Sequence, residues 1–145
     1  MMQLTLTRWT EPEQVLAAYE VYKPCMYLPT EEKFRAKVGA YLRDDAVRVF
    51  GCTAAEKVVG MVAVRVAEGK SMEVLGIAAA ETARGQGIGT FMLRQAAEYC
   101  GAESVFAETD DDAVGFYRKC GFAITKLEKD YDGTTVTRYL CKLEK

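Results

Sequence analysis

The chain has 145 residues, half of them hydrophobic, and a formal net charge of −2. This length fits a single domain spanning residues 1–145, which is large enough to bury roughly two-thirds of its unfolded surface. The mild acidic balance argues against a general nucleic-acid binder, because such proteins normally carry a basic patch and a high pI.

Several other classes are excluded by what the sequence lacks. Charged residues interrupt every apolar stretch well before the ~18 positions that a membrane helix requires, and from the first residues of the sequence we expect no export signal. Five scattered cysteines without a Cys-x-x-Cys pair are typical of a reduced, cytoplasmic protein. The absence of histidine excludes Cys–His and Ser–His nucleophiles and the common zinc sites. We therefore expect no metal, no membrane partner and no nucleic-acid partner.

The N-terminal part of the chain predicts a strand and two helices. Residues 4–8 alternate between apolar and polar side chains, which is typical of a strand. Thr10 offers an N-cap and Pro12 stands near the start of a helix that we expect to end at Pro24. A second helix is expected to begin after Pro29. We expect the two helices to form a lid over one side of the fold.

The middle of the chain predicts a meander followed by a helix. Residues 47–52, 58–66 and 72–79 have strand-like composition and are joined by short connections, so they should pair antiparallel. Residues 88–99 carry apolar side chains at helical spacing, and Gly101 is a plausible C-terminal cap.

The C-terminal part predicts a strand, a helix and a hairpin. Residues 104–108 form the strand, and Asp111 or Asp112 can cap the helix that follows. Residues 122–130 and 134–143 flank a Tyr-Asp-Gly turn signal. The final strand offers an edge for dimerisation unless its charges protect it, so monomer and homodimer both stay open. The order of elements indicates an α+β fold around a mixed sheet.

Three glycines mark the junction before the helix at 88–99, in the sequence Arg-Gly-Gln-Gly-Ile-Gly-Thr over residues 84–90. Glycine lets a backbone come close to a ligand and adopt positive φ, and the first turn of a helix has amide hydrogens without internal partners. Both features favour a bound pyrophosphate. The spacing matches neither a dinucleotide fold nor a P-loop, and the alternative is that the glycines only make a tight turn.

A second segment, residues 110–122, makes the functional interpretation of the glycine-rich segment more specific. Together the two segments resemble the acetyl-CoA-dependent N-acetyltransferases of the GNAT superfamily, whose pattern Arg/Gln-x-x-Gly-x-Gly/Ala is matched by Arg84, Gly87 and Gly89. The later family pattern, Asn-x-x-Ala-x-x-Phe/Leu-Tyr followed by Gly-Phe, is matched by Ala113, Phe116, Tyr117, Gly121 and Phe122. Asp110 stands where the family often has Asn.

The resemblance implies a GNAT-like fold, with a mixed, mostly antiparallel sheet of about seven strands and about four helices. It also implies that the strand at 72–79 splays from its neighbour beyond a bulge, which Gly76 tolerates. The V-shaped gap would hold the pantetheine arm. An ordinary buried strand explains the same side chains equally well.

Acetyl-CoA is the cosubstrate that the resemblance implies. The backbone of the splayed strand would bind pantetheine and polarise the thioester, the glycine loop would bind the pyrophosphate, and Arg84 would add charge. The implied coenzyme A contacts are Ile77, Ala78, Ala79, Arg84, Gly85, Gln86, Gly87, Ile88, Gly89, Thr90, Asp110, Ala113 and Phe116. For Arg84 the alternative is a surface arginine without a ligand.

Tyr117 is the residue that the resemblance implies as general acid for the departing thiolate, and its alternative is a core aromatic on an amphipathic helix. A lysine-like amine titrates near ~10.4, so a base must remove a proton. Glu73 is the first candidate, because it alternates with Leu75 and Ile77 on one side of the strand if no bulge intervenes. Glu108 is the second, and either is alternatively an exposed carboxylate.

The implied reaction is direct transfer of an acetyl group, within a ternary complex, to a primary amine of a small molecule or peptide. A cysteine acetyl-enzyme is disfavoured because no histidine activates a thiol. The N-terminal helices would form the acceptor side, with Tyr22, Lys23, Cys25, Met26, Tyr27 and Phe34 as either lining or packing residues. A non-catalytic acyl-CoA-binding module and a nucleotide-binding protein are the alternative functions.

Overall fold

Seven strands form one sheet in a computed structural model that describes residues 3–26, 28–80 and 87–144. The spatial order is β1-β2-β3-β4-β5-β7-β6, and every neighbouring pair is antiparallel except the parallel pair of β4 and β5. The strands are β1 (Leu4–Trp9), β2 (Val47–Ala54), β3 (Lys57–Ala67), β4 (Ser71–Ala79), β5 (Ser104–Thr109), β6 (Ala123–Tyr131) and β7 (Thr134–Glu144). The prediction of an α+β fold with a mostly antiparallel sheet of about seven strands is confirmed.

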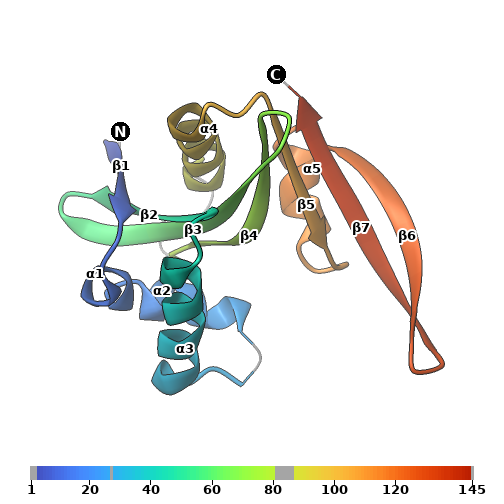
Figure 1. Cartoon of the computed structure of the whole chain (residues 1–145), viewed down its shortest axis with the longest axis horizontal. Helices are drawn as coiled ribbons and strands as arrows, with labels where there is room; N and C mark the ends of the chain where they lie inside the picture. The colour runs from blue at the N-terminus through green and yellow to red at the C-terminus, as the bar shows by residue number, and fades with distance from the viewer. Residues whose placement is uncertain (1–2, 27, 81–86, 145) are drawn as a thin grey trace.

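The helices cover both faces of this sheet (Figure 1). They are α1 (Pro12–Leu16), α2 (Tyr19–Tyr22), the 3-10 helix η1 (Lys23–Cys25), α3 (Glu31–Arg43), α4 (Ile88–Cys100) and α5 (Val114–Lys119). Figure 1 shows α1, α2 and α3 below the sheet and α4 above it. The described part of the chain contains no helix with the length and apolar character needed to span a bilayer.

The first helix differs from the prediction in both its start and its continuity. The N-cap residue of α1 is Glu11, so the prediction of Thr10 as the cap is wrong. The Oε1 atom of Gln14 accepts hydrogen bonds from the backbone N–H groups of Thr10 and Glu11, at 2.9 and 3.0 Å. The Ala18 N–H bonds to the Val15 carbonyl, three residues back, which interrupts the α-helical ladder. A single predicted helix is therefore three short segments, and the described residues contain five α-helices where four were predicted.

The sheet separates two hydrophobic clusters. One lies between the sheet and α4 and α5, and includes Phe50, Val62 and Met92. The other lies between the sheet and α1 to α3, and includes Phe34 and Met61. Because strand side chains alternate between faces, the adjacent residues Met61 and Val62 enter opposite clusters.

A bulge interrupts the pairing of β3 with β4. Ala63 pairs with Gly76 and Val64 pairs with Val74, so Leu75 is an extra residue on β4. The bulge next to Gly76, which the sequence predicted, is confirmed. The extra residue exchanges the faces of the strand: Val74 is in the cluster below α4, whereas Ala78 is in the cluster above the N-terminal helices.

Strands β4 and β5 pair only over a short stretch. Their paired residues are Ser71 with Ser104, Met72 with Val105 and Glu73 with Phe106. Figure 1 shows the two strands side by side at this end and diverging beyond it. The predicted splay of β4 from its neighbour is confirmed, and it begins at the last paired residue, Glu73.

The C-terminal hairpin turns at Asp132 and Gly133, which have φ of 47° and 83°. Two successive residues with positive φ match the right-handed twist of a hairpin, as the turn signal predicted. However, β7 lies between β5 and β6, so the outer edge of the sheet is β6. The interpretation of the final strand as an edge for dimerisation is therefore wrong.

Candidate active site

The β4 residues beyond the bulge line one side of the divergence between β4 and β5. Ile77 and Ala79 pack against the cluster below α4, whereas Ala78 belongs to the opposite cluster and is 7% exposed. The Ile77 carbonyl accepts a hydrogen bond from the Cys25 thiol at 3.6 Å. The splayed edge of β4 is thus in contact with the N-terminal helical layer.

The glycine-rich junction leads into α4. Arg84, Gly85 and Gln86 lie outside the described residues. Gly87 is the N-cap residue of α4 with φ of 76°, a conformation that glycine adopts at little cost. Among the described residues no side chain caps this end of α4 and its first turn carries no acidic residue. The first amides of α4, at Ile88 to Thr90, are therefore suited to an anion.

The two sequence motifs meet where α4 packs against α5. A Cβ atom added to Gly89 would lie 2.4 Å from the Phe116 ring, so this ring occupies the space that a side chain would need. One residue further on, Thr90 Oγ1 lies 3.3 Å from Cys120 Sγ. The structure brings together three residues that the sequence placed at the coenzyme A site: Gly89, Thr90 and Phe116.

Gly89→Ala is expected to destabilise the protein by about 1–3 kcal/mol, because the new methyl group displaces the Phe116 ring. Gly115→Ala, on the exposed side of α5 with no atom within 4 Å of its Cβ position, is the matched control. It is expected to stabilise the protein by about 0.4–1 kcal/mol. Urea unfolding monitored by circular dichroism measures both changes, and equal stabilities for the two variants would contradict the close contact.

Tyr117 lies on the buried side of α5, where the tyrosine is 5% exposed. Its ring makes edge contacts with Phe116 and Phe122, at centroid distances of 5.0 and 5.2 Å. Burial raises the pKa of Tyr117, and charge on Cys141 and Cys120, and to a smaller extent on Cys25, raises it further. The hydroxyl therefore keeps its proton at neutral pH, as a general acid must.

Asp110 fixes the turn before α5. Its Oδ1 atom accepts hydrogen bonds from the backbone N–H groups of Asp112 and Ala113, at 3.1 and 3.0 Å. Asp111 instead accepts a hydrogen bond from the Tyr139 hydroxyl at 2.6 Å. The prediction that Asp111 or Asp112 caps the helix is wrong, because α5 starts later than expected and Ala113 is its N-cap residue.

Glu73 lies at the last paired position of β4, opposite Arg65 on β3 and Phe106 on β5. Its Oε1 atom is 3.6 Å from Nη1 of Arg65, whose Nη2 atom is 3.5 Å from Asp44 Oδ2. The bulge intervenes beyond it, so Glu73 does not share a face with Ile77. It lies on the face of the N-terminal helices, and no sequence pattern signalled its ion pair with Arg65.

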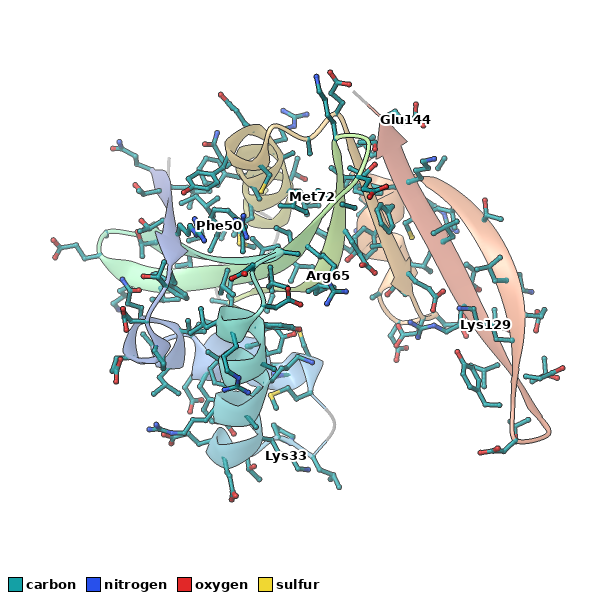
Figure 2. All side chains as sticks on the ribbon, viewed as in Figure 1. Lys33, Phe50, Arg65, Met72, Lys129 and Glu144 are labelled. Carbon is teal, nitrogen blue, oxygen red and sulfur yellow. The ribbon has the colours of Figure 1, made fainter. Side chains whose placement is uncertain are left out.

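Glu108 lies two residues beyond Phe106 on β5, and therefore on the same face of the sheet as Glu73. It receives a hydrogen bond from Lys129 at 2.5 Å and one from Arg138 at 3.3 Å. Figure 2 shows the labelled Lys129 on the hairpin and the labelled Arg65 nearer to α3. The hydrogen bond from Lys129, helped by Arg138, holds the pKa of Glu108 below its ordinary value.

Tyr22 joins the helical layer to the bulge. A Cβ atom added to Gly76 would lie 2.2 Å from the Tyr22 hydroxyl, so glycine is needed there for close approach. Tyr22 is 3% exposed, and burial raises the pKa of its hydroxyl. Cys25 follows on η1 and is exposed, whereas Tyr27 lies outside the described residues. Tyr22 and Cys25, two residues that the sequence predicted on the acceptor side, thus both contact the splayed strand.

Comparisons with known proteins agree with this geometry. The model of the acetyltransferase (GNAT) family matches residues 15–122. A protein from Desulfovibrio desulfuricans assigned to GNAT acetyltransferases has a TM-score of 0.77 at 18% identity, over 98% of this chain and 99% of that chain. A dodecameric spermidine N-acetyltransferase from Vibrio cholerae has a TM-score of 0.71 at 18% identity, over 98% and 94% of the two chains. A comparison with curated proteins finds no significant match.

Proposed function

Because the chain belongs to the GNAT family of acetyltransferases, we propose that it transfers the acetyl group of acetyl-CoA directly to a primary amine of a small molecule or peptide. The observation that carries this proposal is the divergence of β4 from β5 beyond Glu73. It leaves a backbone edge that is not paired with β5, beside the uncapped start of α4 and the buried Tyr117.

The residues around this divergence fit coenzyme A. The backbone of Ile77, Ala78 and Ala79 is proposed to bind the pantetheine arm, and the amides from Gly87 to Thr90 the pyrophosphate, since an uncapped helix start favours an anion. From the sequence alone, the proposed pyrophosphate contacts also include Arg84, Gly85 and Gln86. Ala113 and Phe116 would flank the cofactor, whereas the Asp110 carboxylate is occupied by its own turn.

When bound, acetyl-CoA supplies a thioester whose acyl carbon is open to an amine. Tyr117 holds the proton that the departing sulfur needs, in a buried position that keeps its hydroxyl neutral. Glu73 is proposed to take the proton from the amine, directly or through a water. We prefer it to Glu108, because two cations bind the Glu108 carboxylate and lower its proton affinity.

Glu73→Gln is expected to lower kcat/KM for the amine about tenfold at pH 7, with recovery as the pH approaches the acceptor's own pKa near ~10.4. Above that pH the amine is already neutral and needs no base. Glu108→Gln is the matched control and should change the same quantity less than about threefold. A pH profile from 6 to 10 measures both, and a larger loss in Glu108→Gln would assign the base to Glu108 instead.

Two measurements test the proposed function as a whole. Calorimetry measures coenzyme A binding, and loss of thioester absorbance measures transfer across a panel of amines, polyamines, amino acids, aminoglycosides and peptides. Amine-dependent loss supports the enzyme. Tight binding without turnover on any acceptor would favour a non-catalytic acyl-CoA-binding module, and no binding of coenzyme A would overturn the proposal.

A further inference from the structure

Three charged side chains meet where β4 begins to diverge from β5. Glu73 and Asp44 both contact Arg65, through its Nη1 atom at 3.6 Å and its Nη2 atom at 3.5 Å. The other Asp44 oxygen accepts a hydrogen bond from the Ala46 N–H at 2.9 Å, which holds this carboxylate at the end of α3. Two acids share one base, so this acidic triad of Asp44, Arg65 and Glu73 has one negative charge in excess.

A second triad, with the opposite charge balance, lies on β5 and the C-terminal hairpin. The Glu108 carboxylate contacts both Lys129, at 2.5 Å, and Arg138, at 3.3 Å. Two bases share one acid, so this basic triad of Glu108, Lys129 and Arg138 has one positive charge in excess. Between 29% and 39% of each of the three side chains is exposed, so a ligand can reach this excess charge.

Both triads lie on the face of the sheet that carries the N-terminal helices. Glu73 pairs with Phe106 on β5, and Glu108 follows two residues later, which is a distance of roughly 7 Å along a strand. Phe106 lies between the triads on this face, half-buried and outside both hydrophobic clusters. Lys142, opposite Phe106 on β7, pairs with Glu144 at 3.6 Å and adds no net charge.

This distribution of charge suits an acceptor with a cation at one end and an anion at the other. Each acid of the two triads already contacts a base, whereas a polyamine would need acids that no base neutralises. An amine without an acidic group would leave the excess charge of the basic triad without a partner. A molecule that carries both charges complements both triads. The separation of the triads requires that its two charged groups lie several bonds apart.

We propose that the acceptor is a small ω-amino acid, whose amine contacts Glu73 and whose carboxylate binds Lys129 and Arg138. This inference rests on the proposed function. The methylene chain crosses Phe106, and an α-amino acid is too short because its amine and carboxylate share one carbon atom.

The carboxylate of the acceptor is unchanged by the reaction, so the basic triad acts in binding alone. The acceptor ammonium loses two protons in all. One passes through Glu73 to water, and the other replaces the proton that Tyr117 gives to the sulfur. The carbon–nitrogen bond forms and the carbon–sulfur bond breaks.

Three acceptors with the same six-carbon chain test this inference on the full chain. Aminocaproate, hexylamine and hexamethylenediamine carry the same reacting amine, but end in a carboxylate, a methyl group and a second amine. The value of kcat/KM for aminocaproate should be at least about tenfold higher than for either of the others, because two charge-assisted hydrogen bonds hold its carboxylate. This preference should decrease at high salt, since the triads are partly exposed.

Two variants of the basic triad sharpen the test. Lys129→Glu inverts the charge balance of the triad and should reverse the preference, so that hexamethylenediamine becomes a better acceptor than aminocaproate. Arg138→Met removes only the excess charge and should bring kcat/KM for aminocaproate and hexylamine within about threefold of each other. A loss of stability lowers kcat/KM for every acceptor and cannot reverse their order.

Lys126→Met is the matched control, because Lys126 lies on the same strand as Lys129 but on the opposite face. It pairs in register with Tyr139, whose ring packs against the cluster below α4. This variant should keep the preference for aminocaproate within about twofold.

The possible failures of this inference and of the proposed function are distinguishable. Equal kcat/KM values for the three acceptors, a preference of the unaltered chain for the diamine, or an unchanged preference in Lys129→Glu would overturn the inference and leave the proposed function intact. Transfer to other amines but to none of these three would do the same. A chain that binds no coenzyme A in calorimetry would overturn both.

Discussion

Tyr117→Phe is expected to lower kcat for acetyl transfer about a hundredfold to a thousandfold, which is the usual contribution of a positioned general acid. The phenylalanine ring keeps the edge contacts with Phe116 and Phe122. Coenzyme A affinity should therefore stay within about twofold, because those contacts and the start of α4 are unchanged. Steady-state kinetics gives kcat, and calorimetry gives the affinity.

Tyr139→Phe is the control for loss of a phenol in the same region. Its hydroxyl donates to Asp111 at 2.6 Å, and its half-buried ring packs against the cluster that contains Tyr117. We expect less than a twofold change in kcat for this variant. If Tyr117→Phe also kept kcat within a few fold, Tyr117 would be a packing residue and another group would protonate the sulfur.

Phe34→Ala is expected to lower the free energy of unfolding by about 3–5 kcal/mol, the usual cost of removing a large aromatic side chain from a core. Phe34 is fully buried on α3, with ring centroids 5.4 Å from Tyr19 and 5.7 Å from Tyr22. These contacts pack α2 against α3 and so hold Tyr22 in place beside the bulge. Urea unfolding monitored by circular dichroism measures the change.

Phe106→Ala is the matched control, since this half-buried phenylalanine on β5 belongs to neither hydrophobic cluster. Its loss should cost roughly 1 kcal/mol, because less apolar surface returns to water. Similar costs for the two variants would mean that α1 to α3 are only loosely held against the sheet.

The strands were predictable because their signal is local. Alternation and short connections along residues 47–79 are enough to predict a meander, and the Tyr-Asp-Gly turn is enough to predict the final hairpin. The order of β6 and β7 in the sheet was not predictable in this way. It depends on whether β5 pairs with the first or the second strand of that hairpin, which is a contact between distant parts of the chain.

In the candidate site, too, some residues could be predicted from local sequence and others could not. Gly87 and Gly89 have a local signature, and the structure supplies the reason for Gly89, which is the Phe116 ring. The ion-pair partners of the candidate bases Glu73 and Glu108 have no such local sequence signature. Arg65 and Lys129 are ordinary charged strand residues in the sequence, and only the register of the sheet sets them beside Glu73 and Glu108.

The extra residue at Leu75 determines which face of the sheet each later side chain of β4 points to. Without it, odd and even positions of β4 would keep their sides from end to end, so either Met72 and Val74 or Ile77 and Ala79 would leave the cluster below α4. If this residue were deleted, a single substitution elsewhere would not return the later side chains of β4 to their original face. A deletion at the centre of β4 would therefore change which of the two clusters the second half of this strand faces.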